Sequence, residues 1–149
     1  MEIYDSLLGA VCDEYDKVTL IKKSERGEVT LIRHRASGNR YIFRHFSGSS
    51  EVYRKLLTVS CPNLPQIMEV GEKEGKTALL EEYVQGDTLG EILQGGLLTA
   101  AQAKQITRQL CMALWVLHSL GVVHRDVKPD NVIIRGTEAV LIDFDASRI

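Results

Sequence analysis

The chain has 149 residues, of which 44% are hydrophobic, so it is long enough to bury one sizeable core and to form one ordinary domain or part of one. Its 18 lysines and arginines nearly balance 20 aspartates and glutamates, and a net charge of -2 gives no basic field for a nucleic acid or an anionic membrane surface. The first residues are acidic where a signal peptide is basic, and no apolar run approaches the roughly 18 residues of a membrane span. We therefore expect a soluble, cytoplasmic protein with neither nucleic acid nor membrane as its partner.

The three cysteines point to no special chemistry. Cys12, Cys61 and Cys111 lie far apart and form no C-x-x-C motif, which argues against a disulfide framework and against a zinc site. We expect buried free thiols at all three positions.

The first half of the chain alternates short apolar runs with polar turns, as expected for an antiparallel sheet. Strands are predicted at residues 17–23, 28–36 and 40–46, and a helix within 47–59, where a serine-rich start suits an N-cap. Two apolar runs between 67 and 84, separated by an EKEG turn, predict a hairpin that returns to the sheet. The expected result is an α+β lobe of five antiparallel strands and one helix, spanning about residues 17–84.

The second half reads as helical. Residues 85–96 predict a connector with a short helix, and Thr99 with Gln102 forms a capping-box signal before a long periodic run to about Ser119. The expected buried stripe of that long helix comprises Ile106, Leu110, Ala113, Leu114 and Leu117. A change in composition places the boundary between the two parts near Val84 to Asp87.

Two runs near the end of the chain carry the strongest chemical signal: HRDVKPDN at residues 124–131 and IDFD at residues 142–145. Taken singly, His124 is better interpreted as a core histidine, Asp126 as a turn residue and Asn131 as a cap, but eight ordered positions followed by a D-F turn do not arise readily by chance. Together they resemble the catalytic loop H-R-D-x-K-P-x-N and the metal-binding turn D-F-G of Ser/Thr protein kinases. The resemblance covers about residues 17–148 and implies a protein-kinase-like fold.

The resemblance also implies roles for four residues. Asp126 would accept the proton of the attacking hydroxyl, Lys128 would contact the transferred phosphate, and Asn131 and Asp143 would hold Mg²⁺. The implied cofactors are ATP and Mg²⁺, and the implied partner is a protein substrate with a serine or threonine hydroxyl. Asp145 stands where the family has glycine, so we expect a turn with less backbone freedom.

The resemblance places the remaining nucleotide-binding positions mostly in the first half. Gly27 is the last of the family's three loop glycines, and Arg44 occupies the place of the lysine that holds the α- and β-phosphates, an exchange that is not conservative. In the family a helix glutamate pairs with that lysine. Counting along the chain puts Val52 at the position of this glutamate and Glu51 one residue before it, and one residue turns a helix by about 100°. The other expected nucleotide contacts are Ile21, Val29, Ile42, Glu82, Val84 and Ile133.

Three functions are consistent with these residues. The leading hypothesis is an ATP-dependent Ser/Thr protein kinase catalytic domain. It is incomplete here, since the family continues beyond the D-F-G turn. A partner or a further segment would then cover the incomplete large lobe, to which the helical second half belongs. The alternative is a pseudokinase or interaction module with weak or no nucleotide turnover, favoured by the altered glycine loop and by Arg44. A small-molecule kinase is disfavoured by Arg125 and the Lys128-Pro129 pair.

Overall fold

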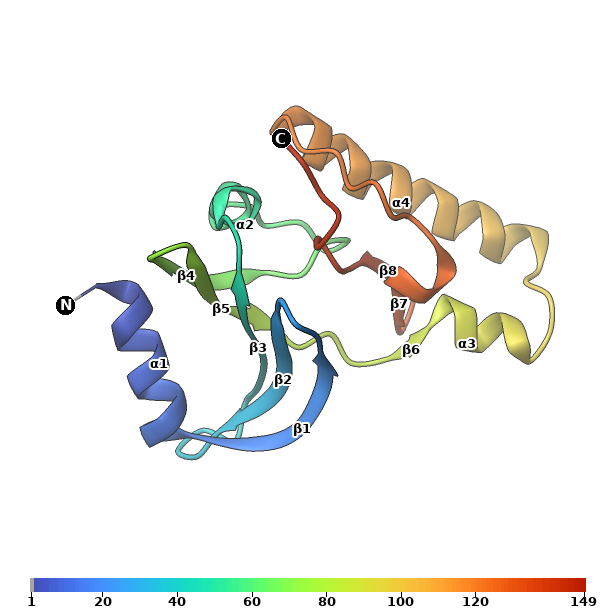
Figure 1. The fold of residues 1–149 in the computed structure, drawn as a ribbon. Helices are drawn as coiled ribbons and strands as arrows, with labels where there is room; N and C mark the ends of the chain where they lie inside the picture. Colours follow the sequence, from blue (N-terminus) through green and yellow to red (C-terminus); the bar gives the residue numbers. More distant parts are fainter. Residues whose placement is uncertain (1) are drawn as a thin grey trace. The chain divides into compact units, whose positions relative to one another are not determined.

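The computed structural model describes residues 2–149 (Figure 1). The chain forms two compact units, the first from Met1–Val59 and Gln66–Tyr83 and the second from Ser60–Pro65 and Val84–Ile149. Each unit is described by itself below. None of the helices in residues 2–149 combines the length and the apolar character needed to cross a bilayer.

The first unit is built on a five-stranded antiparallel sheet in the order β1-β2-β3-β5-β4, which confirms the predicted sheet. Its elements are α1 (Ile3–Glu14), β1 (Tyr15–Lys23), β2 (Gly27–His34), β3 (Arg40–Ser47), α2 (Glu51–Leu56), β4 (Ile67–Lys73) and β5 (Lys76–Glu82). The turn between β4 and β5 has positive φ at Glu74 (52°) and Gly75 (78°), as a two-residue hairpin turn that matches the twist of its strands requires.

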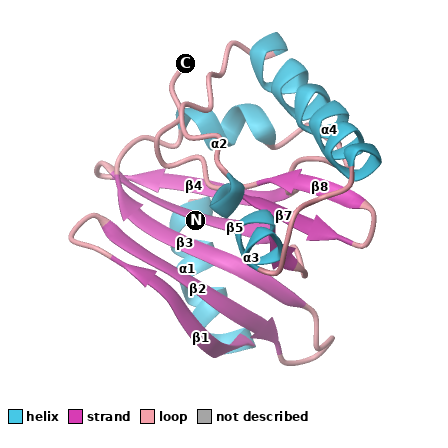
Figure 2. Ribbon diagram, turned by 90° about the vertical axis from the view of Figure 1, so that its right-hand side faces the viewer, coloured by secondary structure: helices cyan, strands magenta, loops and turns pink. Residues whose placement is uncertain are grey.

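Helix α1 was not predicted from the sequence. Tyr4, Leu7 and Val11 follow one another at helical spacing and form a buried cluster with Ile32, Ala78 and Leu80 of the sheet. A side chain at Gly71 of β4 would collide with the backbone of Tyr4, so this glycine lets the helix approach the strand closely. Figure 2 shows α1 on one face of the sheet. The helix gives the sheet a buried face that the strands alone cannot provide.

Helix α2 is short, and the predicted helix of residues 47–59 begins only at Glu51. The hydroxyl of Ser49 accepts the Glu51 N–H at 3.1 Å, and a carboxylate oxygen of Glu72 accepts the Ser50 N–H at 2.7 Å. Hydrogen bonding of the first free N–H groups by neighbouring side chains fixes where the helix starts.

The second unit combines helices with a small three-stranded sheet in the order β6-β7-β8. Its elements are β6 (Asp87–Thr88), α3 (Leu89–Gln94), α4 (Ala100–Ser119), the 3₁₀ turn η1 (Pro129–Asn131), β7 (Val132–Arg135) and β8 (Glu138–Leu141). The predicted capping box is present, since the Thr99 hydroxyl accepts the Gln102 N–H at 3.1 Å and the Gln102 side chain accepts the Thr99 N–H at 3.0 Å. The same arrangement between Thr88 and Glu91 begins α3.

The expected buried stripe of α4 is buried only in part. Ala113 and Leu117 are fully buried, whereas Ile106, Leu110 and Leu114 are half-buried. On the outer side of the helix Met112 and Trp115 are 51% and 67% exposed.

The prediction of three buried thiols was wrong. Cys12 and Cys111 are exposed and Cys61 is half-buried. Cys12 follows the buried Val11 on α1, and one helical step of about 100° turns it from the sheet towards solvent.

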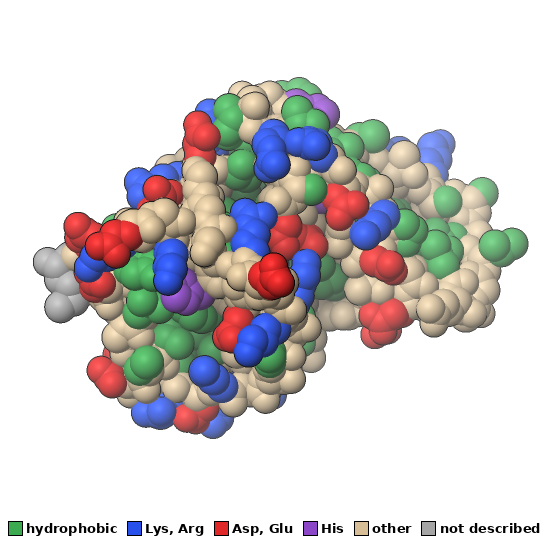
Figure 3. All heavy atoms as spheres, viewed as in Figure 1, with side chains coloured by type: hydrophobic (Ala, Val, Ile, Leu, Met, Phe, Trp, Pro, Cys, Tyr) green, Lys and Arg blue, Asp and Glu red, His purple; other side chains and the backbone are tan. Residues whose placement is uncertain are grey.

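Charges of both signs are interspersed over the face of the molecule shown in Figure 3. Such mixing agrees with the near balance of charge in the sequence and leaves no broad basic surface on that face.

Candidate functional site

His124 is buried and holds the loop of residues 124–131 in place. It is 1% exposed, and its Nε2 lies 3.0 Å from the carbonyl oxygen of Ile142. The backbone N–H of Asp126 donates to Nδ1 of His124 at 3.1 Å, so Nδ1 is an acceptor and Nε2 carries the proton that it donates to Ile142. The ring packs edge-on against Phe144 with its centroid 5.5 Å away. This histidine therefore connects the 124–131 loop to the 142–145 turn.

Asp126 is held by Asn131. The Nδ2 group of Asn131, a residue only 6% exposed, donates to the backbone oxygen of Asp126 at 2.9 Å and to its carboxylate oxygen Oδ2 at 3.1 Å. The Nζ of Lys128 lies 3.8 Å from the same Oδ2. The 3₁₀ turn η1 is closed by a hydrogen bond from the Asn131 N–H to the Lys128 carbonyl at 2.9 Å. This turn brings the side chains of Asp126, Lys128 and Asn131 together.

The 142–145 turn is fixed from within. The Asp145 N–H donates to Oδ1 of Asp143 at 3.1 Å, and Phe144 is 2% exposed. Asp143 has φ +65° and Arg125 has φ +71°, left-handed values that are uncommon for residues other than glycine and that cluster at functional sites. The Ile142 N–H donates to the Asn131 carbonyl at 2.9 Å, which joins this turn to the other loop.

The two loops offer oxygen atoms of the kind that Mg²⁺ prefers. Because Nδ2 of Asn131 is used on Asp126, its Oδ1 remains as an acceptor, and Asp143 offers a carboxylate with one oxygen engaged by Asp145. Mg²⁺ takes hard oxygen ligands and commonly binds through one or two carboxylates while keeping several waters. Within residues 2–149 no cluster of three or more His, Cys, Asp or Glu is placed to hold a metal ion, so a dedicated cage of such residues is not seen.

Arg44 in the first unit makes a buried ion pair with Glu81. Its Nε lies 3.1 and 3.4 Å from the two carboxylate oxygens, and its Nη2 lies 3.2 Å from Oε2. Arg44 is 7% exposed and Glu81 is 3% exposed. On the neighbouring strands Arg44 lies opposite Leu79 and Ile42 opposite Glu81, so the pair is diagonal on one face of the sheet.

Glu51, the residue expected one position out of register, lies elsewhere. It is exposed at the start of α2, and within residues 2–149 its carboxylate makes no hydrogen bond or ion pair. The cation at position 44 is thus paired with the carboxylate of Glu81 on the adjacent strand and not with Glu51. No pattern in the sequence identified Glu81, because Arg44 and Glu81 share a face of the sheet only once β3 pairs with β5.

The turn between β1 and β2, where the family has its glycine loop, is tight. The Ser24 N–H donates to the Gly27 carbonyl at 2.9 Å and the Gly27 N–H donates to the Ser24 carbonyl at 3.2 Å. A side chain at Gly27 would run into the backbone of His45 and Phe46, so the retained glycine serves a close approach of β2 to β3. The guanidinium of Arg26 lies 5.0 Å over the Phe46 ring, and its Nε donates to the Ser47 carbonyl at 3.1 Å.

The remaining expected nucleotide contacts lie on strands or beside them. In the first unit Ile21 is 52% exposed, Val29 is half-buried, Ile42 is buried, and the Glu82 carboxylate accepts the Gln66 N–H at 3.0 Å. In the second unit Val84 is buried and Ile133 on β7 is half-buried. Their roles toward a nucleotide stay predictions.

Comparison with known proteins gives one family. The family model described as the protein kinase domain matches residues 15–149. The chain is 35% identical over 100 residues to the serine/threonine-protein kinase pkn2 of Myxococcus xanthus, a match that covers 64% of this chain and 12% of that protein. It is 28% identical over 153 residues to mitogen-activated protein kinase kinase 7 of Arabidopsis thaliana, covering 95% of this chain and 49% of the relative.

A solved structure agrees on the fold. The crystal structure of Rad53 1-466 in complex with AMP-PNP superposes with a TM-score of 0.76 at 22% identity, covering 90% of this chain and 39% of that one. The chain thus spans from 12% to 49% of the length of these three proteins.

Proposed function

The chain belongs to the protein kinase domain family, and from this premise we propose that it binds ATP with Mg²⁺ and transfers the γ-phosphoryl group to a serine or threonine hydroxyl of a protein. The observation that carries the proposal is the arrangement around Asp126, whose carboxylate is held by Asn131 and lies beside Lys128. The names of the Ser/Thr kinase relatives support the same substrate class.

Asp126 is suited to orient the attacking hydroxyl. Its Oδ2 accepts from Asn131, which leaves Oδ1 to accept the hydroxyl hydrogen of the substrate, and His124 fixes its backbone N–H. Phosphoryl transfer depends mainly on positioning and on electrostatic stabilisation. A carboxylate whose side chain is held by Asn131 and whose backbone is held by His124 is therefore a suitable acceptor for that proton.

Lys128 and the two metal-binding candidates supply the opposite charge. The Lys128 ammonium group, half-exposed and 3.8 Å from Asp126, is placed to contact the phosphoryl group that approaches the hydroxyl. Asn131 and Asp143 would hold Mg²⁺, whose chemistry when bound is to neutralise charge on the phosphate oxygens.

In this proposal the adenine lies against apolar side chains and hydrogen-bonds to backbone groups of Glu82 and Val84. The apolar contacts would be Ile21, Val29, Ile42 and Ile133, with Gly27 and Arg44 on the side of the phosphates. An apolar pocket with a few polar groups is the usual form of such a site.

The second candidate function is an interaction module with weak or no nucleotide turnover. The buried pair of Arg44 and Glu81 favours it, because a guanidinium neutralised at 3.1 Å offers less net charge to a phosphate than an unpaired cation would. The exposed Glu51 points the same way.

Thermal unfolding of the full chain with and without Mg·ATP, beside a phosphotransfer assay on serine, threonine and tyrosine peptides, separates the two functions. A ligand that binds only the folded state raises the unfolding midpoint. We expect a Mg²⁺-dependent rise that Asp143→Ala abolishes, and phosphate transfer to serine or threonine that Asp126→Asn lowers about 10²- to 10⁴-fold.

Asp130→Asn is the matched control, because Asp130 is an exposed carboxylate in the same loop to which no role is assigned. Both activities should survive it. A midpoint rise without transfer in the wild-type chain would favour the interaction module with nucleotide binding, and a cooperative transition insensitive to Mg·ATP would overturn the nucleotide site.

A further inference from the structure

One edge of the five-stranded sheet is formed by β1, to which the proposed phosphotransfer gives no partner. In the order β1-β2-β3-β5-β4, and within residues 2–149, β1 has β2 on one side and no strand on the other. Figure 2 shows it as the outermost strand. The strand at the opposite edge, β4, is contacted by the helices α1 and α2. The outer backbone N–H and C=O groups of an uncovered edge strand can pair with another extended segment.

The side chains of β1 are largely open to solvent. The strand is nine residues long, and every side chain from Lys17 to Lys23 is exposed. Two of these side chains are apolar and about half exposed, Val18 at 45% and Leu20 at 51%. A long edge strand with exposed apolar side chains is the kind of surface to which a partner protein adds a strand.

The charge of this edge is basic. The exposed stretch contains Lys17, Lys22 and Lys23 and no acidic side chain. Asp16, at the start of the strand, is engaged by two arginines, the nearer at 2.8 Å. Glu28 of β2 lies 3.7 Å from Lys23. Three cations beside one carboxylate favour an acidic segment at this edge, although the whole chain has a net charge of -2.

Lys17, Leu20 and Lys23 share one face of the sheet. Their partners on β2 are every second residue of that strand, and such residues point to the same face. The register of β1 shifts between Lys17 and Thr19 and again between Leu20 and Lys22, so the spacing on β1 is three residues instead of two. An added strand therefore meets a cation, an apolar side chain and a second cation in turn on this face.

A second copy of this chain is a poor occupant of the edge. In an antiparallel pair of two β1 strands with Leu20 opposite itself, Lys17 of one copy lies opposite Lys23 of the other. Like charges directly opposite each other on adjacent strands are destabilising. Lysines on an edge strand commonly prevent such self-pairing, and the same lysines attract a segment of opposite charge.

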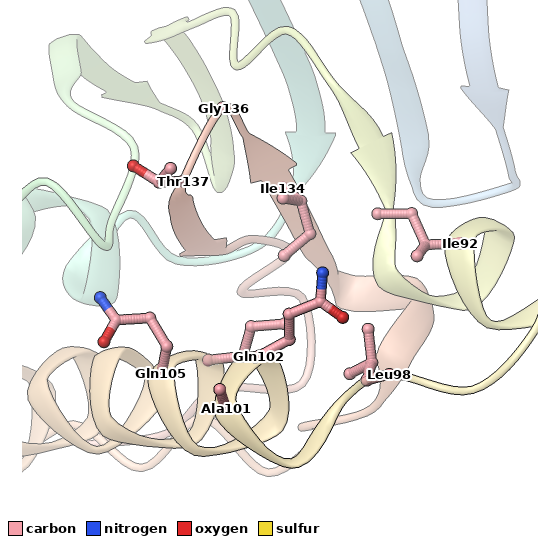
Figure 4. Close-up of a pocket in the computed structure, with 9 residues that line it drawn as sticks. Ile92, Leu98, Ala101, Gln102, Gln105, Ile134, Gly136 and Thr137 are labelled. Carbon is pink, nitrogen blue, oxygen red and sulfur yellow. The ribbon is translucent and has the colours of Figure 1, made fainter.

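Within residues 2–149 the second unit offers no edge of this length. Its strands β7 and β8 are four residues long and β6 is two. On the side of α4, Ile134 of β7 and Leu98 line an apolar pocket, so that side presents side chains and not backbone groups (Figure 4).

We propose that the free edge of β1 is a docking site for an extended acidic segment of a partner protein, which joins the five-stranded sheet as a further strand. The backbone of the segment hydrogen-bonds to β1, an apolar side chain lies against Leu20, and glutamates or aspartates on either side of it meet Lys17 and Lys23. The site requires no nucleotide and is independent of the proposed phosphotransfer.

Fluorescence anisotropy with the full chain tests this docking site. The probe is a fluorescein-labelled peptide in which threonine alternates with glutamate, valine and glutamate, and the comparison peptide carries lysine in place of glutamate. We expect saturable binding of the acidic peptide alone, weakening as salt is raised because exposed charges are screened. The double variant Lys17→Glu/Lys23→Glu should weaken binding about tenfold or more.

N-methylation of the probe separates strand addition from simple attraction between charges. Successive residues of a strand direct their backbone groups to opposite sides. Two peptides methylated at alternate backbone nitrogens, in opposite phase, therefore each lose the donors of one edge. We expect one of them to lose binding and the other to keep it. Equal effects in the two peptides would overturn the proposal, because binding would then not depend on one edge of the peptide backbone.

Arg40→Glu/Lys104→Glu is the charge-matched control, since both cations are exposed and lie outside β1. It should leave binding unchanged, and circular dichroism confirms that each variant is folded. The proposal is wrong if the acidic peptide does not bind, if the lysine peptide binds equally well, or if the control loses binding equally. It is also wrong if light scattering detects a dimer that the acidic peptide dissociates, because a second copy of this chain would then occupy the edge.

Discussion

Arg44 of β3 and Glu81 of β5 form a buried bidentate ion pair on one face of the five-stranded sheet, with Nε and Nη2 of the arginine 3.1 to 3.4 Å from the carboxylate oxygens. The family resemblance expects the partner of residue 44 to come from a helix, but in this chain it comes from the adjacent strand. A strand partner is fixed by the hydrogen-bond register of the sheet. The Arg44 guanidinium is therefore held by the sheet itself.

Removing one member of this pair should destabilise the chain strongly. Glu81→Gln takes away the carboxylate charge that faces the buried guanidinium, and breaking a buried pair costs about 3–5 kcal/mol. The double variant Arg44→Met/Glu81→Leu removes both charges and should unfold near the wild-type midpoint. Urea denaturation of the singles and the double measures the coupling directly.

The exposed pair of Lys73 and Asp5 is the control for that cycle. The Lys73 Nζ lies 2.9 Å from Asp5 and both side chains are 39% exposed, so Lys73→Met should lower the free energy of unfolding far less than Glu81→Gln does. Equal costs for the two pairs would show that burial does not decide how much an ion pair contributes to the stability of this chain.

Glu51→Gln should have almost no effect. The carboxylate is exposed and makes no ion pair within residues 2–149, so we expect a change below about 0.5 kcal/mol in the free energy of unfolding. The midpoint shift produced by Mg·ATP should also be that of the wild type. A large loss of nucleotide response in Glu51→Gln would mean that α2 moves to bring Glu51 to Arg44 in the bound state.

His124→Phe should loosen the catalytic loop. The new ring has a similar size and keeps the contact with Phe144, but the Ile142 carbonyl and the Asp126 N–H lose their partner. A buried polar group left without a hydrogen bond costs about 1–3 kcal/mol, which predicts a loss of about 2 kcal/mol or more on urea unfolding. His118→Phe, on the exposed side of α4, should be nearly neutral.

The stability of the first unit should fall at acid pH because of His45. Burial, and then the charge of Lys76, hold the pKa of His45 below its usual value of 6.5, while Glu28 acts in the opposite direction. The unfolded chain therefore binds the proton more readily, so the stability that His45 contributes is complete above about pH 6.5 and is lost as pH falls through the folded-state pKa. The 2.8 Å hydrogen bond between His45 and Tyr4 of α1 connects this titration to the helix.

Urea unfolding between about pH 5 and pH 7.5, on either side of the usual pKa of histidine, measures this dependence. The free energy of unfolding should decline towards the acid end, and His45→Gln should flatten the decline. An unchanged slope in His45→Gln would assign the acid sensitivity to other groups.

The sequence by itself determined the five strands of the first unit, the start of the long helix and the catalytic motif, but not the small sheet of β6, β7 and β8. Alternating apolar residues specify a strand wherever one face is buried, and the Thr99–Gln102 capping box acts entirely within one turn. The HRDVKPDN and IDFD runs are likewise local, so they identified the family before any contact between them was known.

Only the tertiary structure decided which distant residues meet. The pairing of β3 with β5 placed Glu81 beside Arg44. The packing of Tyr4, Leu7 and Val11 against the sheet made α1 part of the hydrophobic core. The sequence could not supply these facts, because the energy of a buried ion pair or an apolar contact depends on neighbours that are distant along the chain, such as Glu81, which lies 37 residues from Arg44. The catalytic motif and the capping box depend on residues that are close together in the sequence, whereas burial and charge compensation arise only when the chain has folded.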